Sequence, residues 1–175
     1  MIETLISSKT RIKLLLRFFL NPENTAHLRG LADEFGESTN AIRLELNRFE
    51  EADMLTSEKN GNRKMYKANR KHPLFPDVHN ILLKMVGVDH IINYIVHKLG
   101  NLQKVYLTGE FAQGKNSDII DIVIEGDVNK PFLTELIDKA EQKINKRIRY
   151  ITYMPGEFQP NEKEQLNYVL VWDSN

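Results

Sequence analysis

The dipeptide Asn60-Gly61 is the feature of this sequence that most narrows the possible folds. It lies between residues 54–59 and 63–68, two short segments that can form strands. Asn-Gly is the strongest short signal for a tight β-hairpin, because both turn residues must accept a positive φ. The basic side chains Lys59, Arg63 and Lys64 lie beside this turn, so the sequence predicts a hairpin with a basic tip.

Three segments with helical periodicity precede the hairpin. The first covers residues 8–19 and is expected to stop near Asn21-Pro22, since proline ends a helix at this position. The second is short and is expected to end at Gly36, and the third begins with Ser38 or Thr39 as its N-cap. The apolar positions of the first two helices are Ile12, Leu15, Leu16, Phe19, Leu28, Leu31, Ala32 and Phe35.

The third helix has one apolar and one polar face. At about 100° per residue, Ile42, Leu46 and Phe49 share one side and would pack on the earlier helices. The opposite side carries Asn and Arg, whose side chains can form bidentate hydrogen bonds with adenine and guanine. Three helices with a tight turn before the third predict a helix-turn-helix, which places the third helix in DNA. The candidate base or groove contacts are Thr39, Asn40, Arg43 and Asn47, and the candidate phosphate contacts are Arg48, Lys59, Arg63 and Lys64.

The stretch from Ser38 to Asn69, with NAIRLELNRFEEADML and NGNRKMYKA, resembles the winged-helix regulators of the arsenic-repressor type. The resemblance implies that the third helix is a recognition helix and that the hairpin is the wing. Asp53 stands where that family usually has glycine, and the chain has no cysteine, so the family's metal sensing is not implied. Two alternatives remain open: a helical domain with a merely solvated hairpin, and a winged helix used for protein contacts.

The charge of the chain is divided unevenly, although 24 basic side chains balance 24 acidic ones. Residues 1–72 hold 13 Lys and Arg against 10 Asp and Glu, whereas residues 73–175 hold 11 against 14. A polyanion would therefore prefer the first part. The boundary between two domains, 1–72 and 73–175, is expected at His72-Pro73, because a proline disfavours helix in the residue before it.

The second part alternates helices and strands. Two helical segments are expected in residues 76–99 with Gly87 between them, and a longer helix in residues 131–145 with Asn129 as its cap. Strands are expected at 105–108, 119–124, 147–153 and 168–172. This pattern predicts a small mixed sheet with helices packed on it, so the whole chain is assigned to the α+β class.

The segment LTGEFAQGKNSDIIDIVIEGD resembles the signature of the minimal nucleotidyltransferases, relatives of polymerase beta. The tail RIRYITYMPGEF is similar to a segment of regulators that fuse a winged helix to such a domain. The resemblance implies a nucleotidyltransferase-like α/β domain with a remnant pocket. The pocket residues are Gly109, Glu110, Gly114, Asp118 and Asp121. The residues that match the signature are Gly109, Ala112, Gly114, Ser117, Asp118 and Asp121.

These residues do not form a complete catalytic set. Carboxylates on one strand reach the same metal ions at i and i+2, whereas Asp118 and Asp121 are three positions apart. The family's third carboxylate would lie in residues 147–153, which contain no acid, and Glu110 replaces a phosphate-binding serine. A bulge at Ile119-Ile120 would restore one pair at most. Both aspartates are therefore expected to be solvated or capping groups. A pocket for another small ligand and a catalytic metal site are the alternatives.

The leading interpretation is a transcriptional regulator that binds double-stranded DNA. Its second domain is expected to be catalytically inactive, without metal or cofactor, and to serve dimerisation or the sensing of a small-molecule or nucleotide effector. A homodimer is expected because one winged helix makes few contacts with DNA. The alternative is an active nucleotidyltransferase that modifies a small molecule or a protein. No apolar run approaches the ~20 residues that span a bilayer, so we expect a cytoplasmic protein without a membrane partner.

Overall fold

The computed structural model describes residues 4–160 and 167–174. The chain forms two compact units, residues 1–82 and 83–175, which divide within helix α4 (Phe75–Val86). This boundary falls after the expected one at His72-Pro73. The beginning of α4 belongs to the first unit because the ring of Phe75 packs against Phe19, with centroids 5.8 Å apart. In addition, Nδ1 of His79 lies 2.7 Å from the backbone oxygen of Phe19. In the described part of the chain, no helix is long and apolar enough to cross a membrane.

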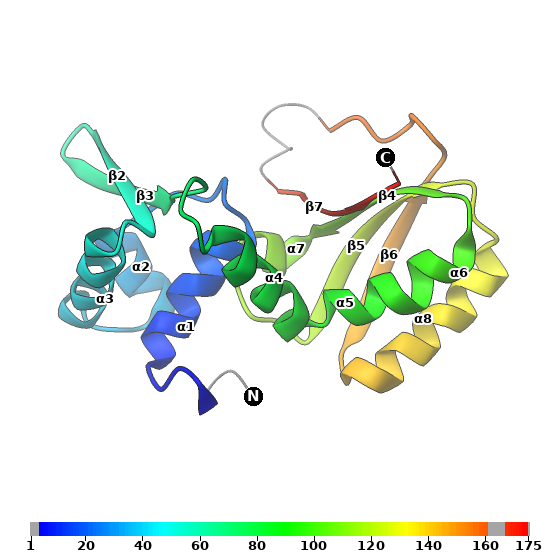
Figure 1. Cartoon of the computed structure of the whole chain (residues 1–175), viewed down its shortest axis with the longest axis horizontal. Coiled ribbons are helices and arrows are strands. Elements are labelled where there is room, and N and C mark those ends of the chain that lie inside the picture. Colours follow the sequence, from blue (N-terminus) through cyan, green and yellow to red (C-terminus); the bar gives the residue numbers. More distant parts are fainter. Residues whose placement is uncertain (1–3, 161–166, 175) are drawn as a thin grey trace. The chain divides into compact units, whose positions relative to one another are not determined.

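The first unit is a winged helix-turn-helix (Figure 1). Helix α1 (Lys9–Leu15) continues through a π-helical segment, η2 (Leu16–Leu20), and is followed by α2 (Leu28–Phe35) and α3 (Thr39–Glu51). The strands β1 (Ala26–His27), β2 (Leu55–Asn60) and β3 (Arg63–Ala68) form an antiparallel sheet in the order β1-β3-β2. The hairpin of β2 and β3 is the wing.

The apolar faces predicted for the three helices form the core of this unit. Ile42 and Leu46 of α3 are fully buried, and so are Phe18 and Phe19 of η2. Of the predicted core positions, Leu28 and Phe35 are only half-buried. The others are buried, as predicted: Ile12, Leu15, Leu16, Phe19, Leu31, Ala32, Ile42, Leu46 and Phe49.

One charged side chain, Glu45, enters this core, and the helix periodicity did not predict it. Its side chain is 8% exposed, and Oε2 lies 2.8 Å from Nε of Arg11 on α1. Ser8, the N-cap of α1, donates a hydrogen bond to Oε1 at 3.1 Å. Burial would raise the pKa of Glu45, but the hydrogen bonds from Arg11 and Ser8 outweigh burial and keep the pKa below its usual value. An ionised carboxylate therefore links α1 to α3.

The ends of α2 and α3 follow the expected capping chemistry. Gly36 ends α2 in the left-handed conformation, and Ser38 caps α3 by accepting a hydrogen bond from the backbone of Ala41. At the end of α3, Asp53 has a φ of 56°, and the next backbone N–H, of Met54, bonds to the carbonyl of Phe49. This is a Schellman motif with aspartate at the position that favours glycine. Asp53, which stands where the resembling family usually has glycine, thus adopts the left-handed conformation that glycine tolerates best.

The turn of the wing differs by one residue from the prediction. Asn60 pairs with Arg63, so the two turn residues are Gly61 and Asn62 rather than Asn60 and Gly61. Gly61 has a φ of 59°, whereas the only described residues other than glycine with a positive φ are Asp53 and Asn145. In a two-residue turn in which only the first residue has a positive φ, glycine is needed only at that first position. The glycine thus decides the register, and Asn60 belongs to the strand.

The second unit is a mixed four-stranded sheet in the order β6-β5-β4-β7. Its strands are β4 (Leu102–Thr108), β5 (Ile119–Gly126), β6 (Arg147–Tyr153) and β7 (Val169–Asp173), close to the four expected ones. Strands β5 and β6 are parallel, and the other neighbours are antiparallel. The helices are α5 (Val88–Ile91), continued by η3 (Ile92–Val96) and α6 (His97–Leu99), with α7 (Gly109–Ala112) and α8 (Lys130–Ile144). This is the small mixed sheet with helices packed on it that the order of helices and strands in the sequence predicted.

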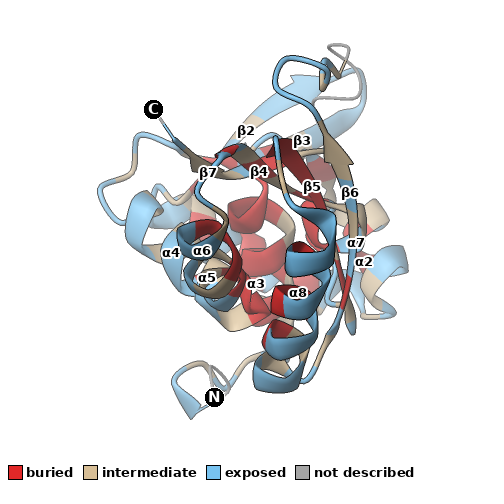
Figure 2. Ribbon diagram, turned by 90° about the vertical axis from the view of Figure 1, so that its right-hand side faces the viewer, coloured by how far each residue is buried: buried red, intermediate tan, exposed pale blue. Residues whose placement is uncertain are grey.

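Helices α5, α6 and α8 lie along one face of this sheet (Figure 1), and the inner sides of α5 and α8 are buried (Figure 2). Ile120, Ile122 and Ile124 of β5 point to that face and are at most 2% exposed. The residues between them point to the opposite face, since side chains alternate along a strand. The pairing of β5 with β6 is regular from Ile119 onward, so the bulge considered at Ile119-Ile120 is absent. Asp121 therefore lies on the face that these helices do not cover.

Replacing Asp53 with glycine is expected to stabilise the chain by about 0.5–1 kcal/mol. The substitution removes the cost of a left-handed residue with a side chain, about 1–2 kcal/mol, and part of this gain is lost to the greater entropy of unfolded glycine. Urea unfolding followed by circular dichroism measures the change. Asp53→Ala is the control, because alanine would have to adopt the same left-handed φ and tolerates it less well than aspartate does. An Ala variant as stable as the Gly variant would contradict the explanation.

Replacing Glu45 with glutamine is expected to lower the free energy of unfolding at neutral pH by about 1–3 kcal/mol, because Arg11 loses its charged partner. The pKa of Glu45 is lower in the folded chain than the usual 4.5. Its contribution is therefore complete above pH 4.5 and is lost as the pH falls through the lower folded-state pKa. Urea unfolding of parent and variant at neutral and acidic pH should show the difference between them shrinking in acid. A difference that is independent of pH would contradict the assignment.

Candidate nucleic-acid interface and nucleotidyltransferase-like pocket

The polar face of α3 points to solvent, as its sequence predicted. Ser38 sets the first turn of the helix, and the apolar side is anchored in the core, so rotation about the helix axis is determined. The residues predicted for contact with a nucleic acid on this helix are all exposed: Thr39, Asn40, Arg43, Asn47 and Arg48. Nη1 of Arg48 also lies 3.1 Å from Oε1 of Glu45, so part of its charge is used within the protein.

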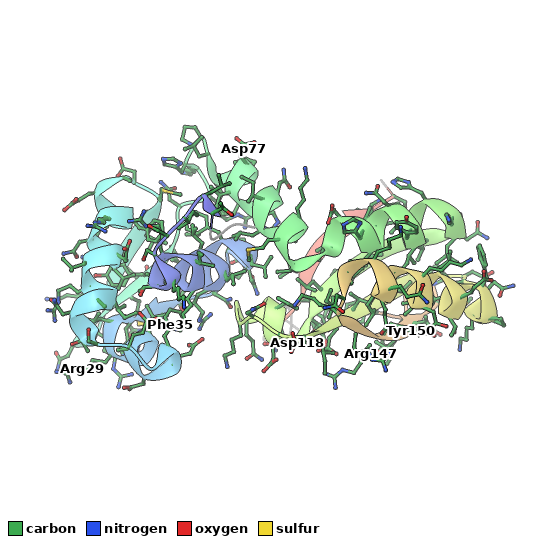
Figure 3. All side chains as sticks on the ribbon, turned by 90° about the horizontal axis from the view of Figure 1, so that it is seen from below. Arg29, Phe35, Asp77, Asp118, Arg147 and Tyr150 are labelled. Atoms are coloured by element: carbon green, nitrogen blue, oxygen red, sulfur yellow. The ribbon has the colours of Figure 1, made fainter. Side chains whose placement is uncertain are left out.

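A groove of about 850 Å³ lies between α2, α3 and the wing. It brings together four of the predicted contact residues, Arg43 and Asn47 from α3 with Arg63 and Lys64 from the wing. It also contains Arg29, an exposed residue of α2 that sequence reasoning missed (Figure 3). Helical spacing showed that Arg29 lies outside the core, but only the packing of α2 beside the wing places it here. Thr39, Asn40, Arg48 and Lys59 do not line this groove.

The wing is attached to α3 by Glu50. Its carboxylate accepts hydrogen bonds from Nζ of Lys64 at 2.6 Å and from Oγ of Ser57 at 2.5 Å. The bond from Lys64 is the main cause that lowers the pKa of Glu50, and the same bond raises the pKa of Lys64. Lys64 lies directly opposite Lys59 across the hairpin, where two like charges repel each other, and Glu50 offsets that repulsion. Part of the charge of Lys64 is therefore used to hold the wing.

The remaining cations of the groove are free to bind a ligand. None of the acidic side chains that the structure describes forms an ion pair with Arg29, Arg43 or Arg63. Three guanidinium groups and the amide of Asn47 thus line one open groove, together with the carboxylate of Asp33. Guanidinium groups bind phosphates and guanine edges in a bidentate manner, and an asparagine amide does the same with adenine. The groove has the chemistry of a nucleic-acid interface.

In the second unit, Asp121 is paired with an arginine. The parallel register places Arg149 of β6 directly opposite Asp121 of β5. Nε and Nη2 of Arg149 lie 2.6 Å and 2.9 Å from the two carboxylate oxygens, so the pair is bidentate. Hydrogen bonding and charge attraction to Asp121 raise the pKa of Arg149, with a smaller effect from the charge of Glu110. Sequence reasoning noted that β6 has no acid but missed that Arg149 takes up the carboxylate of Asp121.

Gly109 and Glu110 form the first turn of α7 beside this pair. Gly109 has a φ of 66°, and a Cβ at this position would collide with the carboxylate of Asp121. Glu110 is exposed, and its carboxylate adds negative charge where the family has a serine. Gly114 follows α7 with a φ of 75° and closes the turn through a hydrogen bond to the carbonyl of Phe111. The two glycines allow the left-handed backbone conformations at each end of α7, and they have no side chain that could bind a ligand.

Asp118 does not share this site, although the sequence placed it in the same remnant pocket. It precedes β5 and lies next to the start of β6, where its carbonyl accepts a hydrogen bond from the backbone of Arg147 (Figure 3). It lines a separate pocket of about 530 Å³ together with residues of α8 and β6. The two aspartates are separated because Asp118 lies in the bend before β5, whereas Asp121 lies within the strand.

Two divalent cations do not fit the donor set around Asp121. The described residues contain no group of three or more acidic or histidine side chains that could hold a metal ion. The position opposite Asp121 carries a guanidinium group, which repels a cation and occupies both carboxylate oxygens. This arrangement lacks the carboxylates that align metal-bound phosphates in two-metal catalysis.

No family model matches the sequence, and no curated protein matches it. The chain resembles several solved structures. AF1382 from Archaeoglobus fulgidus has 18% identity and a TM-score of 0.40 over 49% of this chain and 97% of that chain. The adhesin competence repressor AdcR from Streptococcus pyogenes has 13% identity and a TM-score of 0.38 over 53% and 72% of the two chains. A toxin–antitoxin structure with AMP-PNP has 17% identity and a TM-score of 0.40 over 50% and 73%. Because every one of these TM-scores is below 0.5, none of the likenesses assigns a function to the chain.

Proposed function

We propose that this chain is a transcriptional regulator that binds duplex DNA through α3 and the wing. The observation that carries the proposal is the groove in which Arg29, Arg43, Asn47 and Arg63 meet. Its lining also includes Asp33, but none of the ion pairs among the described residues involves these three arginines. A winged helix with such a groove presents α3 to the major groove and the wing to the backbone. The fully buried apolar side of α3 keeps that helix rigid enough to read bases.

The residues divide into two roles. Asn40, Arg43 and Asn47 lie on the exposed face of α3 and contact base edges, and Thr39 at the first turn contacts the groove wall. The phosphate contacts come from cations around this face: Arg29, Arg48, Lys59, Arg63 and Lys64. Since Lys64 also holds the wing through Glu50, Arg63 is the wing cation lining the groove that is left for DNA.

The second domain is proposed to be catalytically inactive and to serve dimerisation or the sensing of a small-molecule or nucleotide effector. The guanidinium of Arg149 on Asp121 supports inactivity, because it takes the place where a second metal-binding acid would be needed. A homodimer would double the few contacts that one winged helix makes and would match a two-fold symmetric operator.

Two substitutions in the groove test the DNA interface. A duplex is first selected from a random-sequence library with the parent protein, and binding to it and to an unselected duplex is measured by fluorescence anisotropy over a range of salt. Arg43→Ala is expected to reduce discrimination between the duplexes about tenfold, as expected for the loss of one bidentate base contact. Arg63→Ala is expected to weaken binding to both duplexes alike and to lower the salt slope by about one.

Lys139→Ala on α8 is the matched control, because it removes an exposed cation from the other domain. This variant should bind both duplexes as the parent does. If Arg43→Ala and Arg63→Ala also bind like the parent, the DNA-binding surface has been placed wrongly. If the parent selects no duplex, the proposed function is wrong.

A separate assay tests the inactivity of the second domain. The chain is incubated with magnesium and ATP labelled at the α-phosphate, with its own side chains and a set of small acceptors as possible targets. We expect the parent to transfer no more label than Asp121→Ala, because the carboxylate is bound to Arg149 and has no metal-binding partner. Label that the parent transfers and Asp121→Ala does not would identify an active nucleotidyltransferase.

A further inference from the structure

One apolar side chain lies on the otherwise polar outer face of α3. Leu44 is 53% exposed, and it is the only large apolar residue of α2, α3 and the wing that is exposed in the described part of the chain. Exposed leucine costs hydration free energy unless something covers it. The role of Leu44 is not explained by the core, because the core residues of α3 lie on the other side of the helix.

The neighbours of Leu44 on the helix surface are candidate DNA contacts. Asn40 lies one turn before it and Arg48 one turn after it, and Asn47 lies three residues on. Residues three and four positions apart adjoin each other on a helix. Leu44 is thus surrounded by side chains that carry hydrogen-bond donors toward a ligand. A surface for a protein partner would need a wider apolar patch than a single leucine among polar groups.

We propose that Leu44 reads a thymine by packing against its 5-methyl group. This proposal rests on the proposed function, because it requires α3 to enter the major groove. There, the thymine methyl is the apolar group that base edges display, and cytosine presents a hydrogen at the same carbon. Contact with the methyl removes apolar surface of both partners from water. The asparagine side chains of Asn40 and Asn47 beside Leu44 hydrogen-bond with the adjacent bases, so the site prefers thymine beside adenine.

The test removes the methyl group from the DNA and the leucine from the protein. In the duplex selected by the parent protein, each thymine is replaced in turn by uracil, which keeps every hydrogen-bonding group. The parent should lose about fourfold in affinity at one thymine per half-site, as expected for burying one methyl group. Leu44→Ala should bind the thymine duplex about as weakly as the parent binds the uracil duplex, and it should not distinguish the two.

Leu74→Ala is the matched control, because Leu74 is exposed to a similar extent, 54%, and lies outside α3. It should retain the full sensitivity to uracil. The proposal is wrong if the parent binds every uracil duplex as well as the parent duplex, or if Leu44→Ala keeps the same sensitivity as the parent. Both of those outcomes leave DNA binding itself intact. Failure of the parent to bind any selected duplex would instead overturn the proposed function.

Discussion

One buried carboxylate adds a directional bond to the core that orients α3. The apolar core supplies most of the stabilisation and sets which side of α3 faces inward, but apolar contacts are not directional. Glu45 is different, because its oxygens accept hydrogen bonds from Arg11 and Ser8 at the start of α1. An unpaired buried carboxylate would cost several kcal/mol, roughly 3–5, so α3 is held with this side inward. The opposite side, with Arg43 and Asn47, is thereby presented to solvent as a single polar face.

A similar use of acidic side chains sets how much positive charge the wing can offer. Glu50 binds Lys64 and Ser57, which joins the wing to the end of α3. That attachment consumes part of the charge of Lys64, so the groove relies more on guanidinium groups such as Arg63. Guanidinium groups suit this task, because their planar donors can bind a phosphate or a guanine in two places at once. The small net charge of the domain is therefore compatible with a locally cationic groove.

The second domain shows how one residue changes the chemistry that a fold can support. The parallel pairing of β5 and β6 brings Arg149 to the carboxylate of Asp121, where both oxygens are bound. Glycine at position 109 leaves room for that carboxylate, so the surrounding backbone retains a form suited to an acid at this place. The donor set around Asp121 is therefore not that of a two-metal site.

The sequence alone determined the local elements, because helix periodicity, capping residues and strand alternation depend on neighbours along the chain. The apolar face of α3, the cap at Ser38 and the four strands of the second sheet were predictable for this reason. Long-range packing decided the rest. It placed Arg29 of α2 beside the wing, Arg149 opposite Asp121, and Asp118 in a different pocket. Such contacts depend on strand register and on the packing of distant segments. Residue spacing in one sequence contains no information about either.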